Sequence, residues 1–587
     1  MAGCRAFEIG RAIPCAYALL ALALSSALLL QSRQRGPAEF SFWLSAYVGV
    51  GLVSSWRPRW SPLAAGAAAF LLGIVKTHRA GPNLDLGLGL IALSLAVFVL
   101  DRLVKGEPMG SLDPAGMALL LIAAWSLVSL GFVVPRIRGF APAPGFGYRP
   151  YPFNALRLSS EEALIRAVIG ATAMFSWFGL YEFGRSVSIP RGVLRGVVTG
   201  LLLLNGVTLL VQQHVDPFFL LHAGRPIGRF NGVTSYCYAL GDAALAFFLL
   251  LPAWGSSRGR AGVLTLVNLA LIVYAVVASG SRLALLVPLV VTFAWAGVRA
   301  FRLSRKRPRL AAAVSLGGVA LFLAVATWAY RATPADWVSP VGRLKLGIER
   351  DGLLGHLFVT RLNSYRLVGR VLAAYPLTGV GAGLYAAEVS KQHALLAPQA
   401  GITEPYLQSS FVPNQFLNAG AELGAPALIA LIVAFACVGV SAFSRRGDPR
   451  LLDLAVSFVG LTVALQAAPS FYTSEALVFS WLVVGGAASG SLTPRERAAE
   501  EVPRAGTAAL LAGAVALGIV GQILARPALA LDSQWRRLRW PMNLGLLRRE
   551  EGGRWTRPET TFTVNAAGPQ LRLRWHVGDV AAPDYQV

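Results

Sequence analysis

Long apolar runs recur along this chain, separated by shorter polar connections. Between residues 11 and 525, many of them reach about 20 residues, the length that an α-helix needs to cross the hydrocarbon core of a bilayer. The pattern predicts an all-α polytopic membrane protein with about 15 transmembrane helices. The expected spans are 12–31, 39–56, 61–76, 84–101, 114–134, 163–184, 192–212, 235–254, 262–280, 283–299, 311–330, 422–443, 451–467, 474–490 and 507–525.

Composition agrees with a membrane protein. Of the 587 residues, 55% are hydrophobic and 14% are charged, whereas soluble domains have roughly 45–50% apolar and about 25% charged residues. A set of soluble domains is therefore excluded. The first apolar run is longer than the core of a signal peptide, so we expect a retained span. Cys4, Cys15, Cys237 and Cys437 have no C-x-x-C spacing, which argues against a disulfide framework or a zinc site.

The formal net charge of +24 comes from 53 Lys and Arg against 29 Asp and Glu. Most basic residues fall in every second connection, as expected when positive loops stay in the cytoplasm. This distribution favours orientation and contact with anionic membrane lipid over nucleic-acid binding. With the N-terminus cytoplasmic, the inner connections hold Arg57 and Arg59, Arg102 and Lys105, Arg185, Arg191 and Arg195, Arg258 and Arg260, the cluster 299–309, Arg445, Arg446 and Arg450, and Arg495 and Arg497.

Five regions are expected along the chain. They are N-terminal transmembrane helices at 1–184, central transmembrane helices at 185–331, a long periplasmic loop domain at 332–420, C-terminal transmembrane helices at 421–525 and a periplasmic tail at 526–587. Apolar spacing predicts a loop helix over 358–375 with arginines on its outer face, ended by a glycine-rich turn at 376–383. In the tail, alternating residues around 560–565 and 570–577 predict two strands. We expect these strands to pack on the loop or on a partner chain.

Several arginines lie on the outer side, where topology does not require them. Arg225 and Arg229 precede the span at 235–254, Arg282 lies in a tight turn between two spans, and the long loop carries seven further basic residues. Guanidinium groups at this depth offer planar donors for phosphate oxygens. The alternative is that they are solvated, reach lipid phosphates or pair with loop acids. For Arg282 the boundary position favours a ligand.

Four stretches resemble the O-antigen ligase/polymerase superfamily over roughly residues 190–490. They are G228-R-F-N-G-V-T-S-Y-C-Y-A-L-G-D242, S279-G-S-R-L-A-L-L, the stretch from Arg361 through V-L-A-A-Y-P-L-T-G-V-G-A-G-L to Tyr385, and P413-N-Q-F-L-N-A-G-A-E-L-G. The resemblance implies a GT-C-type glycosyltransferase of the bacterial inner membrane. Its donor would be a polyprenyl(undecaprenyl)-pyrophosphate-linked glycan at the periplasmic face, with no cofactor and no metal. The long loop and the C-terminus would then be periplasmic.

The resemblance also implies roles for individual residues. Arg282 and Arg361 take the positions of the catalytic arginines and would neutralise the pyrophosphate leaving group. Arg225, Arg229, Arg366 and Asn414 are the expected substrate-binding residues. Many ligases have His-Asn where this chain has Pro413-Asn414, so the acceptor's base is missing there. Candidate replacements are His393, Glu404 and Glu422, although Glu422 can equally be a structural residue at the start of a span.

We expect glycan polymerisation or ligation onto a glycan or glycolipid acceptor, in O-antigen or exopolysaccharide assembly. The missing histidine favours a polymerase over a ligase. One alternative is a flippase or exporter of polysaccharide or glycolipid, for which the intramembrane acids Glu182 and Asp242 are thin support. Another is a non-catalytic member of the superfamily within an assembly complex of partner proteins. The glycines at 379–383 lack a P-loop lysine and indicate a turn.

Overall fold

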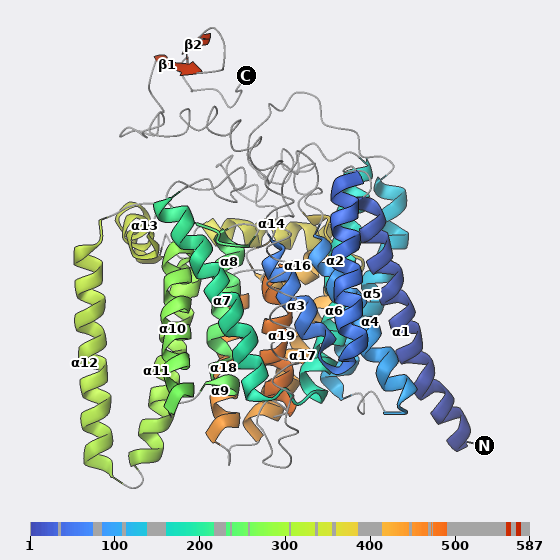
Figure 1. Cartoon of the computed structure of the whole chain (residues 1–587), viewed down its shortest axis with the longest axis horizontal. Coiled ribbons are helices and arrows are strands. Elements are labelled where there is room, and N and C mark those ends of the chain that lie inside the picture. Colours follow the sequence, from blue (N-terminus) through green and yellow to red (C-terminus); the bar gives the residue numbers. More distant parts are fainter. Residues whose placement is uncertain are drawn as a thin grey trace.

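The computed structural model describes residues 2–32, 37–73, 85–107, 113–137, 160–215, 230–234, 237–255, 259–304, 307–334, 339–354, 360–385, 412, 414–444, 449–467, 471, 473–489, 559–564 and 571–576. Helices make up nearly all of these segments. Figure 1 shows that most of them run side by side as a bundle, with α14 lying across one end and α9 near the other. We call these the α14 end and the α9 end.

Seven helical elements form the N-terminal part of the bundle. They are α1 (Ala2–Ser32), α2 (Pro37–Trp56), the 3-10 helix η2 (Pro58–Trp60), α3 (Ser61–Leu71), α4 (Leu86–Val104), α5 (Pro114–Ile137) and α6 (Ser160–Ser186). The central part holds α7 (Arg191–His214), α8 (Cys237–Leu249), α9 (Leu251–Trp254), α10 (Gly259–Ser279), α11 (Arg282–Ser304) and α12 (Pro308–Ala332). The remaining helices are α13 (Pro340–Leu354), α14 (Thr360–Ala374), α16 (Gln415–Leu423), α17 (Ala425–Ser444), α18 (Pro449–Leu465) and α19 (Ser474–Ser489).

Among the described residues, eight helices are long and apolar enough to cross a membrane. These spans are Ala12–Ser32, Leu86–Val104, Pro114–Phe132, Ala163–Ser186, Arg191–His214, Gly259–Ser279, Arg282–Ala300 and Ala425–Ser444. Four of the other expected spans coincide with shorter apolar helices: Phe40–Trp56, Cys237–Leu249, Leu451–Leu465 and Ser474–Ser489. The multi-pass membrane protein is thus confirmed, and the count of about 15 spans stays a prediction.

The remaining expected spans differ in their outcome. The span expected at 61–76 contains α3, which is only 11 residues long. The expected span 311–330 lies within α12, whose 25 residues form one continuous helix. The expected span 507–525 lies outside the described residues.

Helices α6 and α19 lie at the centre of the core. The side chains of α19 are buried from Ser474 to Ala488. Gly184 of α6 and Gly485 of α19 approach so closely that a Cβ on either residue would meet the other helix's backbone. Small residues permit this contact, which gives van der Waals packing that lipid tails cannot replace.

A second, smaller apolar cluster lies at the α14 end. It joins Ala163 and Ala167 of α6 to Leu367, Val368 and Val371 of α14, together with the loop that follows α14 and with Ala421 of α16. This cluster anchors the loop helix to the bundle.

The tail contains two strands at the expected positions. Strands β1 (Glu559–Val564) and β2 (Leu571–His576) pair antiparallel, with Phe562 opposite Leu573. Among the described residues, β1 and β2 contact chiefly each other, so the expected packing of this hairpin on the long loop stays a prediction.

Candidate functional site

The turn between α10 and α11 positions Arg282 at the start of a helix. Gly280 adopts a φ of 62°, a left-handed conformation that favours glycine. The Ser281 hydroxyl accepts a hydrogen bond from the Ala284 N–H at 3.3 Å and so caps α11. Arg282 is the first residue of α11 and is half-buried. Its positive charge adds to that of the helix N-terminus, so this point attracts anions.

The segment 230–234 packs against this turn. The Phe230 N–H donates to the carbonyl of Ala278 at 2.8 Å. The side-chain amide of Gln212 on α7 donates to Asn231 and to the Gly232 carbonyl, both at 3.2 Å, and accepts from the Gly232 N–H at 3.0 Å. Arg225 and Arg229 lie outside the described residues, but Arg229 directly precedes Phe230 in the chain. Two of the expected outer segments are therefore joined.

The loop helix α14 has the amphipathic character expected from its sequence. Leu367, Val368 and Val371 are buried, whereas Arg366 and Arg370 are exposed. Arg361 is the second residue of α14, and its side chain lies outside the described part. It precedes Tyr365 by one helical turn, so the two residues share a face of α14.

The glycine-rich turn after α14 is a packing element. Gly379, Gly381 and Gly383 all have positive φ angles. The Val380 and Gly381 N–H groups donate to the Ala421 and Glu422 carbonyls at 3.0 and 2.8 Å. These bonds confirm a turn, and they tie it to α16.

Glu422 does not open a span, contrary to the expectation from the sequence. It lies in the last turn of α16, and Gly424, with a φ of 82°, separates it from α17. The carboxylate is 4% exposed and accepts from the Gly383 N–H at 2.9 Å. Burial and the Glu422 charge raise the pKa of the Tyr385 hydroxyl. This geometry favours the structural interpretation of Glu422.

Asn414 is the N-cap of α16. Its side-chain oxygen accepts from the Phe416 and Leu417 N–H groups, both at 3.0 Å. Its amide nitrogen donates to the side-chain oxygen of Gln466 at 2.8 Å. The main-chain oxygen of Gln466 in turn accepts from the Tyr365 hydroxyl at 3.1 Å. Gln466, just beyond the end of α18, therefore links α14 to α16.

Helices α11 and α18 pack antiparallel. Arg299 of α11 pairs with Asp453 of α18 at 3.1 Å. Further along, a Cβ on Gly460 of α18 would contact Val291 and Val287 of α11. Along this contact, residue numbers fall on α11 as they rise on α18, so the two helices run in opposite directions.

This register brings Arg282 level with Gln466. At the rise of an α-helix, Gln466 lies roughly 9 Å along the axis from Gly460, and Arg282 lies roughly 8 to 14 Å from Val287 and Val291. The two residues are thus within about one helical turn of each other in height. The start of α11 and the end of α18 therefore lie at the α14 end of the bundle, where Gln466 bonds to Tyr365 of α14.

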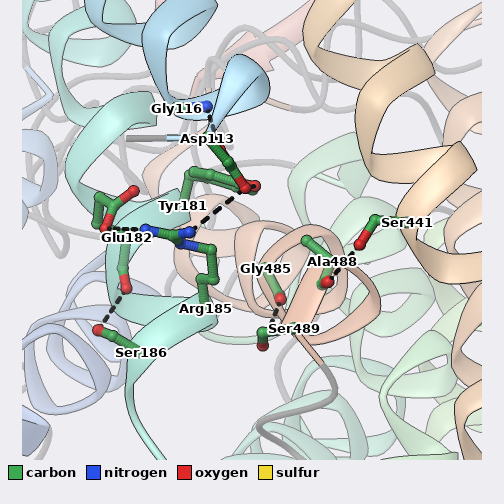
Figure 2. A network of polar contacts seen from close by, with 10 residues as sticks. All are labelled: Asp113, Gly116, Tyr181, Glu182, Arg185, Ser186, Ser441, Gly485, Ala488 and Ser489. Atoms are coloured by element: carbon green, nitrogen blue, oxygen red, sulfur yellow. Dashed lines mark hydrogen bonds and ion pairs between the residues drawn. The ribbon is translucent and has the colours of Figure 1, made fainter. Parts of the chain in front are cut away.

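The intramembrane acid Glu182 belongs to a separate cluster on α5 and α6 (Figure 2). It is 1% exposed and pairs with Arg185 at 3.1 Å. Arg185 also contacts Asp113 at 3.4 Å, and Tyr181 donates to Asp113 at 2.7 Å. Asp113 caps α5 by accepting from the Gly116 N–H. The arrangement joins α5 to α6.

The candidate bases His393 and Glu404 lie outside the described residues, and so does Pro413, which stands where many ligases have histidine. Within the described part, no group of three or more His, Cys, Asp or Glu side chains could hold a metal ion. The sequence analysis missed Gln466 and Gln212, because both lie at the ends of apolar runs, where an isolated amide is inconspicuous. No family model and no curated protein matches the chain.

Proposed function

We propose that this protein is a metal-independent membrane glycosyltransferase that uses a polyprenyl-pyrophosphate-linked glycan as donor. The product is a polymerised or ligated glycan, with polymerisation favoured. The α14 end of the bundle would face the periplasm of a bacterial inner membrane. The carrying observation is that Arg282 at the start of α11 lies at the same end of the bundle as α14, whose Tyr365 bonds to Gln466 at the end of α18. Arg361 shares a face of α14 with Tyr365.

The proposed reaction depends on the positive charges of two arginines. Arg282 and Arg361 would hold the two phosphoryl groups of the donor. The bond between the sugar's C1 and the pyrophosphate oxygen breaks, and the electron pair stays on the pyrophosphate. Fixed guanidinium groups stabilise this developing charge more in the transition state than in the ground state. An acceptor hydroxyl oxygen bonds to C1, and its proton passes to a base.

The structure bears on which residue is the general base for the acceptor hydroxyl. Glu422 is buried and bonded to the Gly383 N–H, and a general base needs to reach the acceptor hydroxyl. We therefore favour His393 or Glu404 over Glu422. Arg225, Arg229 and Arg366 would bind the glycan or the phosphates beside the two catalytic arginines.

The transporter alternative has weaker support. Its best candidate for proton coupling, Glu182, is paired with Arg185 in a cluster that joins two helices. A buried ion pair of this kind is a structural feature more readily than a proton relay.

The test is release of free polyprenyl pyrophosphate by the purified full chain, reconstituted with a lipid-linked oligosaccharide and an acceptor glycan. An enzyme releases the carrier, whereas a transporter or a non-catalytic assembly subunit does not. Arg282→Ala and Arg361→Ala should each lower the rate by at least about a hundredfold. The matched control is Arg260→Ala, which removes an exposed arginine at the start of α10. Full activity in both site variants would refute the site assignment.

A further inference from the structure

Gln466 is an exposed residue that bonds to two of the motif-bearing elements in the described part of the site, to one through its main chain and to the other through its side chain. Its main-chain oxygen binds the Tyr365 hydroxyl, and its side-chain oxygen binds Asn414. The inference that follows rests on the proposed function and deepens it. It concerns which atom of this amide faces the substrate.

A chain of hydrogen bonds fixes the orientation of the amide. Two backbone N–H groups of α16 point at Asn414, so its oxygen has to face them and its nitrogen has to face away. That nitrogen needs an acceptor, and Gln466 presents its oxygen at 2.8 Å. The nitrogen of Gln466 consequently faces the other way. Its contact within the described residues is the Thr462 carbonyl at 3.5 Å, the outer limit of a hydrogen bond.

The end of the bundle at which this nitrogen lies carries arginines. Arg282 lies at a similar height on the neighbouring helix α11, and Arg361 shares a face of α14 with Tyr365. A neutral donor at an arginine-bearing end of the bundle suits an oxygen of an anionic group.

We infer that Gln466 is a further substrate-binding residue, whose amide nitrogen donates to a phosphoryl oxygen of the polyprenyl pyrophosphate. Asn414 is then a positioning residue that acts through Gln466. This assigns the substrate contact to a side chain that the motif P413-N does not contain. Asn414 itself has both polar atoms engaged and is 7% exposed.

Two isosteric changes separate the donor from the scaffold. Gln466→Glu keeps an oxygen for Asn414, replaces the outward donor with a carboxylate oxygen and adds one negative charge. Asn414→Asp keeps the cap of α16, but it presents an acceptor to Gln466. The Gln466 amide then turns to donate to it and directs its own oxygen outward. Both variants should therefore fold with unchanged thermal stability and both should lose the same donor.

The experiment measures binding of undecaprenyl pyrophosphate to the full chain in phosphatidylcholine nanodiscs, with undecaprenol as the probe without phosphate. Gln466→Glu and Asn414→Asp should each weaken binding of the pyrophosphate roughly ten- to a hundredfold and leave undecaprenol unaffected. Gln213→Glu is the matched control. It adds the same charge on α7 and keeps an acceptor for Tyr274, which donates to Gln213 at 2.7 Å.

Each outcome is decisive. Unchanged affinity in Gln466→Glu overturns the assignment, and so does a loss of turnover on lipid-linked glycan without a loss of pyrophosphate binding, which would place Gln466 on the sugar. Unchanged affinity in Asn414→Asp overturns its positioning role. A protein that binds the pyrophosphate through Gln466 but releases none from lipid-linked glycan upholds this inference and overturns the proposed function.

Discussion

Gly170 of α6 and Gly383 of the turn after α14 lie in direct backbone contact. A Cβ on Gly170 would fall on the backbone of Gly383, and a Cβ on Gly383 would fall on the carbonyl of Arg166. Two residues more than two hundred positions apart in the sequence are thus in close contact at the edge of the candidate site. This contact, together with the apolar cluster below α14, holds the arginine-bearing helix on the bundle.

Gly170→Ala should destabilise the protein, because backbone atoms cannot give way as a flexible side chain can. Overpacking of this kind costs about 1–3 kcal/mol, and thermal unfolding of the purified protein measures it. Gly369→Ala is the control, since a Cβ on this exposed residue of α14 would meet no atom within 4 Å. Equal melting temperatures for the two variants would show that the close contact is not tight.

Gln212→Met should loosen the segment 230–234. The change keeps the size of the side chain but removes the bonds of Gln212 to the Gly232 N–H, the Gly232 carbonyl and the Asn231 side-chain oxygen, at a cost of about 1–3 kcal/mol. The measurement uses a chain whose native cysteines are replaced and which carries a cysteine introduced at Val233. Val233 is fully buried in the wild type. We expect Gln212→Met to make maleimide labelling of this cysteine faster. Gln213→Met is the control, because Gln213 bonds to Tyr274 and not to this segment. Labelling at the control's rate would contradict the prediction.

Arg185→Met should be strongly destabilising, because it leaves the buried carboxylate of Glu182 without its cation. Removing one partner of a buried pair costs about 3–5 kcal/mol. The double variant Glu182→Gln with Arg185→Met should recover most of that loss, which a double-mutant cycle of unfolding free energies measures. The contrasting ion pair is that of Arg299 with Asp453, where the arginine side chain is 70% exposed. Arg299→Met should lower the free energy of unfolding by no more than about 1 kcal/mol. A larger loss in Arg299→Met than in Arg185→Met would contradict the prediction.

Much of the architecture could be predicted from the sequence. Hydrophobic length predicted the membrane spans, because crossing a bilayer requires a fixed number of apolar residues per helix. Helical periodicity predicted α14, whose buried and exposed faces follow from local spacing alone. Serine and glycine in the stretch 279–281 predicted the turn that presents Arg282. In each case the information lies within a few neighbouring residues.

Other features depend on contacts between distant segments. Glu422 follows an apolar pattern that continues into the next span, and only the packing of Gly424 against Leu377 shows where α16 ends. The link from Tyr365 through Gln466 to Asn414 joins three segments whose relative positions are set by side-chain packing. An amide at the end of an apolar run gives no local sign of its partners.

The sequence by itself therefore determined that this chain crosses a membrane many times and carries arginines at the starts of α11 and α14. Both properties follow from local hydrophobicity, charge and helical spacing. Only the tertiary structure decided that these two helices come to the same end of the bundle as the end of α18, and that Gln466 bonds to both α14 and α16. That arrangement depends on the antiparallel register of α11 and α18 and on backbone contacts at Gly170 and Gly383, which no local pattern encodes.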